Sequence, residues 1–596
     1  MKFYIKKRDT TARIGEITIK NKKIKTPNIF FLDTKNIKAP EIADIVITQK
    51  KQNTQKPTIR INDFLIYPKA LINNIYEEEI KKQKEKKKNY YILSGKIDLI
   101  DKEIKDNKSN LLIIGNANQL YKKPKEFINY IVTIKEKIGT EKNLYLPAIA
   151  EPNNLSILTY LGIDFFDSIK AITAARNKIF LFQTNNIDIE DLNEIPCSCP
   201  SCIKIKNPKK IENKSILNHN YYMLKNEINH IRNSINNSKL RNLVESRVNN
   251  NPHLTTLLRE YDKNNYKYIE KNTPVNSKSK IIATTKESFN RAEIKRFQNR
   301  VIKRYKKPES SKILLVLPCS AKKPYSFSKS HNLFKKKIFY SGNQCIFHEL
   351  IITSPIGLVP RELELVYPAS NYDIPVTGLW DEDEKKMIRE LLISYLKNNK
   401  YEHIITHLPK NLNDFVKNIF ENPVNTCIDH PTSNKSLELL EKTLKEYGKK
   451  YKKINSQKRK IDDFKSFASY QFGRKIANDL IKNSNVKGKY PYQKLFSEKS
   501  QLGMIIKERG MISLTLKGAE RLIEHKKYWV EIFNDFNLIG SVFSPGIKNA
   551  DEDIRLGDEV IVLQNKKLKG VGVAMMNGEN MKKSSYGEAV KIRHLH

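Results

Sequence analysis

Short apolar runs alternate with longer amphipathic segments over residues 1–250. Runs of this kind are YYILSG at 90–95, NLLIIGNA at 110–117, NLYLPAIAEP at 143–152 and GIDFFDSI at 162–169. Apolar strands with helices between them form βα units, whose strands lie parallel in one sheet. The pattern therefore predicts an α/β domain in this part of the chain, built either as a barrel or as a doubly wound sheet.

The rest of the chain is predicted to hold a linker and three further domains. Residues 251–311 are polar and rich in Asn, Lys and Ser, which indicates a linker followed by a basic helix. A second α/β domain is predicted for residues 312–450, and a small α+β domain for residues 451–508. Residues 509–596 contain short alternating strands separated by turns with glycine or asparagine, a pattern typical of a small β-barrel.

Basic residues outnumber acidic ones by a wide margin. The chain has 108 Lys and Arg against 65 Asp and Glu, which gives a formal net charge of +43. Part of the lysine surplus is what an AT-rich genome produces through composition alone. A deficit of acids this large also indicates a polyanionic partner, and nucleic acid is the leading candidate.

Other features of the sequence exclude several classes of protein. Six cysteines among 596 residues exclude a disulfide scaffold. The first ten residues lack the apolar core of a signal peptide, and no stretch approaches about 18 uninterrupted apolar residues. No phosphate-binding P-loop and no dinucleotide fingerprint is visible, so we expect no nucleotide or redox cofactor. We therefore predict a soluble, cytoplasmic protein without a membrane segment.

A cluster of three cysteines predicts a metal site. Cys197, Cys199 and Cys202 form a C-x-C-x2-C pattern, and His219 follows in a helix-like segment. Three thiolates and one imidazole fill all four positions around a tetrahedral Zn²⁺ ion, which indicates a structural rather than a catalytic metal. His230 is the alternative fourth ligand, on spacing alone.

The cysteine cluster and two other segments resemble tRNA-guanine transglycosylases. Residues 10–31 resemble the N-terminal hairpin of that family, and residues 160–180 resemble its GxDxFD segment. The resemblance implies a modified (β/α)8 barrel with a zinc appendage, and it aligns Asp167 with the nucleophilic aspartate. The family's DSGG-type motif, which supplies a second catalytic aspartate, is missing between residues 30 and 110. Because base exchange needs both a nucleophile and an acid–base partner, we expect a barrel that has lost base exchange, with Asp167 as a relic or a base-binding group.

The end of the chain resembles a PUA domain with its leading segment at 499–522. Residues 464–481 also resemble the small domain that precedes PUA in these proteins. Several glycines, Gly518 among them, stand where turns and close backbone approach are needed. The resemblance implies binding of structured RNA through phosphates and 2′-hydroxyl groups, which would account for the basic surplus.

The second α/β domain carries a dense set of reactive side chains directly after an apolar strand. The segment 314–331 reads LLVLPCSAKKPYSFSKSH. Loops after the carboxyl ends of strands are where α/β domains build their sites. We expect the neighbouring lysines to lower the pKa of the Cys319 thiol, and His331 to move a proton near neutral pH. Buried packing is the alternative role for Cys319.

The same segment matches the archaeosine synthase pattern P-C-x3-K-P-Y-x2-S-x2-H at every position, and residues 354–384 also resemble that family. The resemblance implies an enzyme that modifies tRNA bearing 7-cyano-7-deazaguanine (preQ0) at position 15 of the D-loop. It would add an amine to the nitrile carbon and so form an amidine. The amine donor (lysine, glutamine or ammonia), a radical-SAM lyase as partner and a homodimer are left open.

The resemblance also implies roles for individual residues. A thiolate adds to a nitrile to give a thioimidate, so Cys319 is the expected nucleophile, and Lys323 and Tyr325 are expected to polarise the nitrile nitrogen. The catalytic set is Cys319, Lys323, Tyr325, Ser328 and His331. The substrate-binding set is Asp167, Arg361, Glu362, Asp373 and Asp381, the last four as candidates for holding the amine donor.

Two other functions are kept as alternatives. The first is an active transglycosylase that inserts preQ0, which the missing DSGG-type motif disfavours. The second is a non-catalytic tRNA-binding subunit, which the intact reactive segment disfavours, because binding alone does not require a thiol beside a lysine, a phenol and an imidazole.

Overall fold

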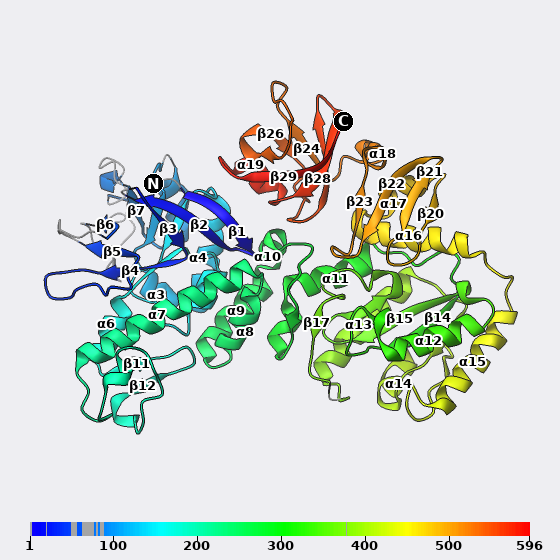
Figure 1. The fold of residues 1–596 in the computed structure, drawn as a ribbon, viewed down its shortest axis with the longest axis horizontal. Coiled ribbons are helices and arrows are strands. Elements are labelled where there is room, and N and C mark those ends of the chain that lie inside the picture. Colours follow the sequence, from blue (N-terminus) through cyan, green and yellow to red (C-terminus); the bar gives the residue numbers. More distant parts are fainter. Residues whose placement is uncertain are drawn as a thin grey trace. The chain divides into compact units, whose positions relative to one another are not determined.

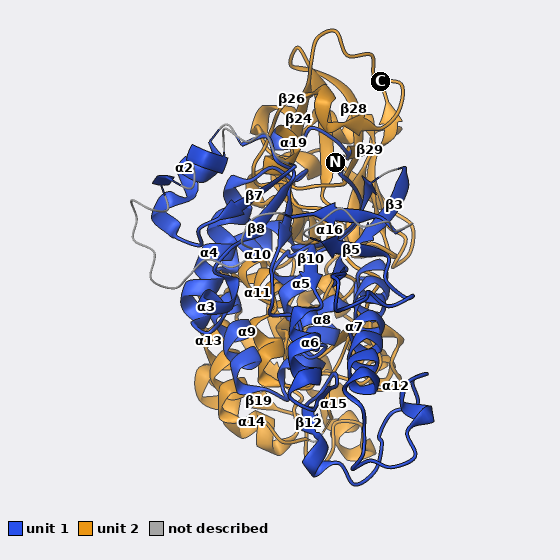
Figure 2. Cartoon of the chain, turned by 90° about the vertical axis from the view of Figure 1, so that its left-hand side faces the viewer, with its two compact units in different colours: residues 1–273, 583–587 blue, residues 274–582, 588–596 orange. Residues whose placement is uncertain are grey.

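The computed structural model of the chain, shown in Figure 1, describes residues 3–19, 21–48, 56–61, 77–78, 81–83, 89–105, 107–376 and 378–596. These residues divide into two units, which Figure 2 colours separately. The first unit comprises residues 1–273 and 583–587, and the second comprises residues 274–582 and 588–596. No helix in the described ranges is both long and apolar enough to span a bilayer.

A parallel sheet of seven described strands forms the centre of the first unit. The strands are β4 (Asn28–Leu32), β5 (Ile45–Thr48), β6 (Thr58–Arg60), β7 (Tyr90–Leu93), β8 (Leu111–Ile114), β9 (Asn143–Tyr145) and β10 (Phe165–Asp167). They lie in the order β6-β5-β4-β10-β9-β8-β7, and all neighbours are parallel. The sheet is a half-barrel, which confirms the transglycosylase-like α/β fold. The expected closure by an eighth strand is not seen among the described residues.

The inner face of the half-barrel is a packed core. Phe30, Tyr145 and Phe165 stand on adjacent strands, and the ring centres of Phe30 and Phe165 are 4.6 Å apart. Apolar side chains of the N-terminal antiparallel sheet join the same core. That sheet consists of β1 (Phe3–Asp9), β2 (Ala12–Ile19) and β3 (Lys22–Thr26). The interior is therefore filled by aromatic and aliphatic side chains.

Helices and a small hairpin complete the first unit. The hairpin of β11 (Ile179–Leu181) and β12 (Asn186–Asp188) leads through the cysteine cluster into the long helix α7 (Asn213–Asn236). Helix α9 (Pro252–Asn264) packs against α4 (Pro124–Lys137). The polar stretch that follows residue 251 therefore begins as a helix of the first unit.

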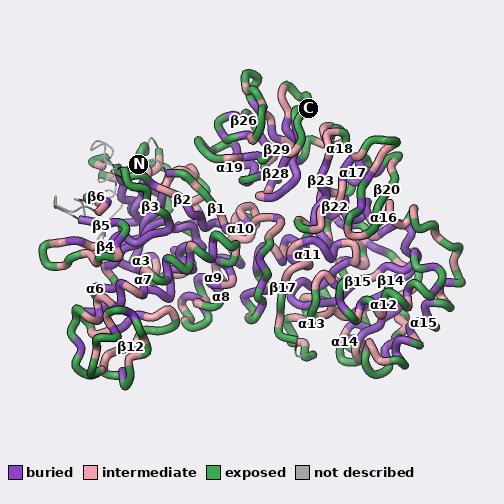
Figure 3. Tube along the Cα trace, in the orientation of Figure 1, coloured by how far each residue is buried: buried purple, intermediate pink, exposed green. Residues whose placement is uncertain are grey.

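The second unit contains the second α/β domain. Its sheet consists of β14 (Ile313–Pro318), β15 (Phe347–Thr353), β16 (Gly357–Pro360), β18 (His403–Thr406) and β19 (Val424–Asn425), in the order β16-β15-β14-β18-β19. The central strand β14 is parallel to both of its neighbours, β15 and β18. Its residues from Ile313 to Leu317 are fully buried (Figure 3). Because β14 is the central strand, it ends in the middle of the carboxyl edge of the sheet.

Two smaller sheets follow. The first has four antiparallel strands, β20 (Asn485–Lys487), β21 (Lys494–Ser497), β22 (Ser500–Ile506) and β23 (Met511–Leu514), next to helix α16 (Ser456–Phe472). The second is a nearly closed barrel with the order β25-β29-β28-β27-β24-β26, from β24 (Trp529–Ile532) to β29 (Glu588–Leu595). Gly518 lies between them, and a Cβ there would meet the carbonyl oxygen of Leu502 at 1.9 Å. A side chain at this position would therefore force the backbone apart.

Candidate active site and metal centre

Cys319 follows directly after the central strand of the second α/β domain. Its side chain is partly exposed, whereas the strand before it is fully buried. Thr353 ends the neighbouring parallel strand β15, and its hydroxyl group forms a hydrogen bond with the Cys319 thiol. Strands β14 and β15 are parallel neighbours, so their carboxyl ends meet at one edge of the sheet. This arrangement brings the side chains of Cys319 and Thr353 together.

A chain of hydroxyl groups continues from Thr353 into the site. The Thr353 hydroxyl is hydrogen-bonded to the hydroxyl of Tyr372, whose oxygen lies 2.6 Å from that of Tyr325. Both tyrosines are buried. Tyr372 belongs to β17 (Tyr372–Asp373), a short strand that pairs with β13 (Ile281–Ile282). The Nζ of Lys323 lies 4.0 Å from the centre of the Tyr372 ring.

The thiol at this site is less acidic than the sequence led us to expect. Burial raises the pKa of Cys319, and the hydrogen bond from Thr353 and the charge of Lys323 offset this rise only in part. Burial also lowers the pKa of Lys323. Our expectation of a lowered thiol pKa is therefore wrong: the cation is present, but desolvation outweighs it. The pKa values of the Cys319 thiol and the Lys323 amine are thus brought closer together, which suits a proton transfer from Cys319 to Lys323.

His331 lies next to the strand end, and its ring centre is 5.3 Å from that of Tyr325. Its Nε2 is 3.1 Å from the carbonyl oxygen of Pro318, and its Nδ1 is 2.7 Å from Nη2 of Arg361. Burial and the Arg361 charge lower the pKa of His331 to about 2. The imidazole is therefore neutral at physiological pH and fixed by two partners. This differs from the expected proton shuttle and fits a positioning residue that holds the loop of Cys319.

Ser328 also has a local structural partner. Its hydroxyl accepts a hydrogen bond from the backbone N–H of His331 at 3.2 Å and so caps the N-terminus of α12 (Lys329–Tyr340). The reactive segment is thus divided by its fold. Cys319, Lys323 and Tyr325 lie around the hydroxyl groups of Thr353 and Tyr372, and Ser328 and His331 make the contacts that support the loop.

Arg361 and Glu362 line a separate polar cavity of about 180 Å³. Arg361 forms ion pairs with Glu349 and with Glu364, the latter at 2.9 Å. Glu362 lies 3.2 Å from His348. The charged residues that line the cavity are Lys335, Glu349, Arg361, Glu362, Glu364, Arg459 and Asp463. Two of the four residues that we expected to bind a donor therefore share one cavity, but Arg361 is already neutralised by two carboxylates.

Asp373 and Asp381 are placed differently. Asp373 pairs at the surface with Lys280 at 3.2 Å. Asp381 caps α13 (Glu382–Asn398), where it accepts a hydrogen bond from the backbone N–H of Glu384 at 2.8 Å. Neither residue is among those that line the polar cavity.

Asp167 ends strand β10 in the first unit and is completely buried. Its carboxylate accepts hydrogen bonds from the Tyr145 hydroxyl at 2.7 Å and from the backbone N–H groups of Ala148 and Ile169, both at 2.8 Å. Burial raises the pKa of Asp167 to about 6, and these three hydrogen bonds oppose the rise. The carboxylate is thus held by partners of its own domain.

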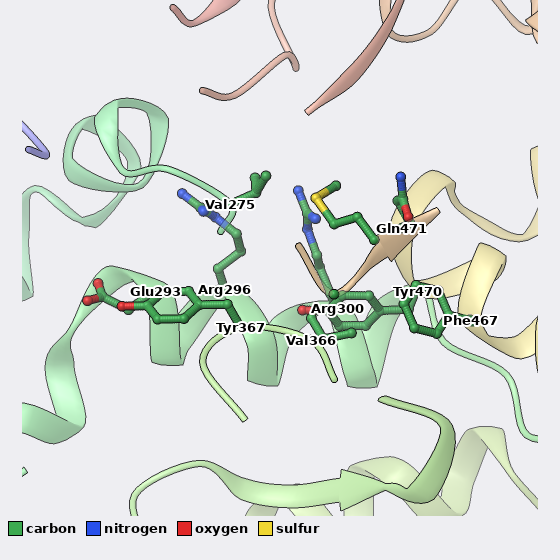
Figure 4. A pocket seen from close by; sticks show the side chains of 11 residues that line it. Val275, Glu293, Arg296, Arg300, Val366, Tyr367, Phe467, Tyr470 and Gln471 are labelled. Carbon is green, nitrogen blue, oxygen red and sulfur yellow. The ribbon is translucent and has the colours of Figure 1, made fainter. Parts of the chain in front are cut away.

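A second pocket of the second unit is too small for a substrate. Figure 4 shows Arg296 and Arg300, from helix α11 (Ala292–Lys303), near the rings of Tyr367 and Tyr470. The space among them is about 10 Å³, which holds no more than a water molecule.

The four expected metal ligands lie together in the first unit. The ligand atoms of Cys197, Cys199, Cys202 and His219 are all within 4.8 Å of one another. Nδ1 of His219 faces the thiols, 3.2 Å from the Cys202 sulfur, and Nε2 lies 3.1 Å from the carbonyl oxygen of Leu181. The second contact fixes the tautomer that leaves Nδ1 free for a metal. The set is compatible with a structural zinc ion.

Two residues of the active-site pocket escaped sequence reasoning. Thr353 ends an apolar strand that follows β14 in the sequence. Its position beside Cys319 could have been predicted if the two strands had been taken as neighbours in one sheet. Tyr372 reaches the site through a two-residue strand, and no pattern in the sequence signals such a pairing.

Three segments match known protein families. Residues 98–253 match the family described as queuine tRNA-ribosyltransferase, residues 294–444 match a domain of unknown function (DUF5591), and residues 536–596 match the PUA domain. The first match lies within the half-barrel unit, and the last covers most of the nearly closed C-terminal barrel.

The chain also resembles several characterised proteins over most of its length. It is 37% identical over 508 residues to the archaeosine synthase subunit alpha of Methanosarcina acetivorans, covering 82% of this chain and 80% of that protein. It is 34% identical over 493 residues to the archaeosine synthase of Haloferax volcanii, covering 81% and 82%. Identity to the tRNA-guanine(15) transglycosylase of Methanobrevibacter smithii is 26% over 494 residues, covering 79% and 69%. The chain belongs to the archaeosine synthase family.

Proposed function

We propose that this protein converts the nitrile of preQ0, at position 15 of the tRNA D-loop, into an amidine by adding an amine donor. The observation that carries the proposal is the group of side chains at the end of β14, where a partly exposed thiol stands beside an amine and three hydroxyl groups. Membership of the archaeosine synthase family supports the same substrate. The PUA match supports binding to tRNA.

The proposed chemistry needs no oxidation or reduction. Lys323 takes the proton of Cys319, and the sulfur adds to the nitrile carbon to form a thioimidate. The nitrile nitrogen gains a proton from Lys323. Burial raises the pKa of Tyr325, so its phenol stays protonated and can donate a hydrogen bond to that nitrogen. The amine donor then adds to the same carbon, the carbon–sulfur bond breaks, and the thiol is regenerated as the amidine leaves.

The polar cavity is proposed to hold the amine donor. Four carboxylates line it, against two guanidinium groups and one ammonium group. The surplus of negative charge favours a ligand with an ammonium group. His331 joins the two places, because it contacts both Pro318, next to Cys319, and Arg361 in the cavity.

The experiment that tests this function is nucleoside analysis of preQ0-bearing tRNA after incubation with the protein and one amine at a time. We expect a mass increase equal to that of lysine, glutamine or ammonia with one donor only. If every donor leaves preQ0 unchanged while labelled guanine enters the tRNA, the protein is a transglycosylase and the proposal is wrong.

Asp167→Asn tests whether the modified base docks at Cys319 or at the half-barrel. An asparagine amide cannot accept all three hydrogen bonds that Asp167 now accepts, so we expect the first unit to lose about 1–3 kcal/mol of stability. Amidine formation by the folded protein should be unchanged, because the base is proposed to dock at Cys319. A lowered melting temperature with normal single-turnover rates is the expected pair of results. Loss of chemistry at full stability would instead indicate that the base docks at the half-barrel.

Binding to tRNA should depend strongly on salt. If the net charge of +43 reflects contacts to about six or more phosphates, affinity should fall about 10³-fold between 50 and 200 mM monovalent salt. Fluorescence anisotropy with labelled tRNA measures this slope directly. An affinity that is flat over this range would mean that the basic surplus is compositional.

A further inference from the structure

Two exposed aromatic side chains stand in a basic surface of the second unit, at the C-terminal end of helix α12. Phe339 is 62% exposed and Tyr340 is 53% exposed. Lys336 lies three and four residues before them and therefore on the same side of the helix. Adjacent exposed rings are more informative than single exposed apolar side chains, because contiguous apolar surface often marks an interaction site.

The end of α15 (Asn434–Lys449) lies directly beside this helix end. The side-chain amide of Asn343 donates to the carbonyl oxygens of Gly448, Tyr451 and Lys452, at 3.3, 3.2 and 3.3 Å. A Cβ at Gly448 would come within 3.2 Å of the Ser341 carbonyl oxygen, so the two backbones are in close contact. The aromatic pair and the lysines after Gly448 are thus held at one edge of the domain.

This edge is strongly cationic. We call it the basic edge and define it as Lys336, Phe339, Tyr340, Lys449, Lys450, Lys452 and Lys453, all of them exposed. Within the described residues, only Lys450 of these lysines forms an ion pair, with Glu446 at 3.7 Å. Lysines at a helix C-terminus also complement the helix dipole. That role does not extend to Lys452 and Lys453, which lie beyond α15, and it does not account for the exposed rings.

We propose that the basic edge is a second RNA-binding surface, which contacts unpaired nucleotides of the tRNA outside the modified base. Lysines without acidic partners suit phosphates, and exposed rings among them suit stacking of bases that are not in a duplex. A protein partner would need acidic groups for the lysines and an apolar socket for the two rings, whose centres lie 5.9 Å apart. The proposal takes tRNA as ligand from the proposed function and adds a place where the RNA is held.

The test measures binding of the full chain to an unmodified tRNA transcript at several salt concentrations. Lys452→Gln combined with Lys453→Gln should weaken binding and reduce the slope of log affinity against log salt by about two. The matched control is Lys386→Gln with Lys397→Gln, which removes two exposed lysines from α13 in the same unit. The control should keep the wild-type slope.

The rings are tested with Phe339→Leu and Tyr340→Leu, which keep apolar bulk but remove the aromatic faces. We expect affinity to fall about tenfold at unchanged salt slope, since stacking is not a counterion effect. Unchanged affinity in both the lysine and the leucine variants would overturn the proposal. So would a shift from dimer to monomer on sedimentation without loss of RNA binding, which would make the edge a contact between copies. Because this assay needs no chemistry, it is independent of whether preQ0 becomes an amidine.

Discussion

Replacement of Cys319 by alanine is expected to abolish amidine formation and to leave tRNA binding intact. Among the described residues at this site, only the thiol can form the thioimidate, so its loss should lower the single-turnover rate by at least about 10³-fold. Cys319→Ser should recover little, because a neutral hydroxyl is a much weaker nucleophile than a thiolate. The measurements are the rate of amidine formation by mass spectrometry and tRNA affinity by anisotropy.

Cys427→Ala is the matched control, since Cys427 is a buried cysteine of the same domain with no place in the pocket. It should react at the wild-type rate.

The raised pKa of Cys319 adds a second signature, because the thiolate fraction, and with it the rate, should rise as pH increases from neutral to alkaline. Lys323→Gln removes both the proposed base and the charge that lowers this pKa, so it should reduce the rate and move the remaining profile to higher pH. Near-normal rates for Cys319→Ala would mean that the amine attacks the nitrile directly and that the thiol is structural.

Loss of the metal site should unfold part of the first unit without a selective effect on chemistry. Cys202 is buried, and its sulfur lies 3.2 Å from Nδ1 of His219, so Cys202→Ala removes a central ligand. Structural zinc contributes about 10–16 kcal/mol to the folding of small zinc domains, and we expect a loss of several kcal/mol here. Elemental analysis should find one zinc per wild-type chain and less in the variant, and the melting temperature of the first unit should fall by about 10 °C or more.

His230→Ala distinguishes between the two possible histidine ligands. His230 lies near Arg247 on the surface of α7, outside the cluster of ligand atoms, so this variant should keep both its zinc and its stability. Wild-type protein that folds without zinc, or zinc that is lost only on replacement of His230, would contradict the assignment of the four ligands.

Short-range patterns in the sequence predicted two groups of side chains that the structure brings together. The spacing of Cys197, Cys199 and Cys202 predicted a metal site, and the four ligand atoms do converge. The apolar strand before Cys319 predicted a thiol at the carboxyl edge of a sheet, which is where it lies. Both cases depend on neighbours within one strand or loop, where residue order largely fixes position.

The electrostatics of the site could not be predicted in the same way. The lysines near Cys319 in the sequence suggested an acidic thiol, but how deeply a side chain is buried depends on strands that come from elsewhere in the chain. His331 likewise owes its lowered pKa first to burial and then to the charge of Arg361, which is 30 residues away and arrives after a strand reversal. The strand of Tyr372 is positioned by its pairing with β13, about 90 residues earlier in the chain, and local sequence does not predict such a contact.

The buried environment of Cys319 also bears on the protein's resistance to chemical damage. Peroxides and alkylating agents attack thiolates far faster than thiols, and cysteines that serve as redox sensors are acidic and exposed. A sulfur that remains protonated in the resting protein is shielded from such reagents, even where its residue is partly exposed. Under the proposed function its reactivity would depend on a substrate that offers the nitrile carbon next to Lys323, and desolvation of the resting thiol would then contribute to selectivity against small electrophiles in the cell.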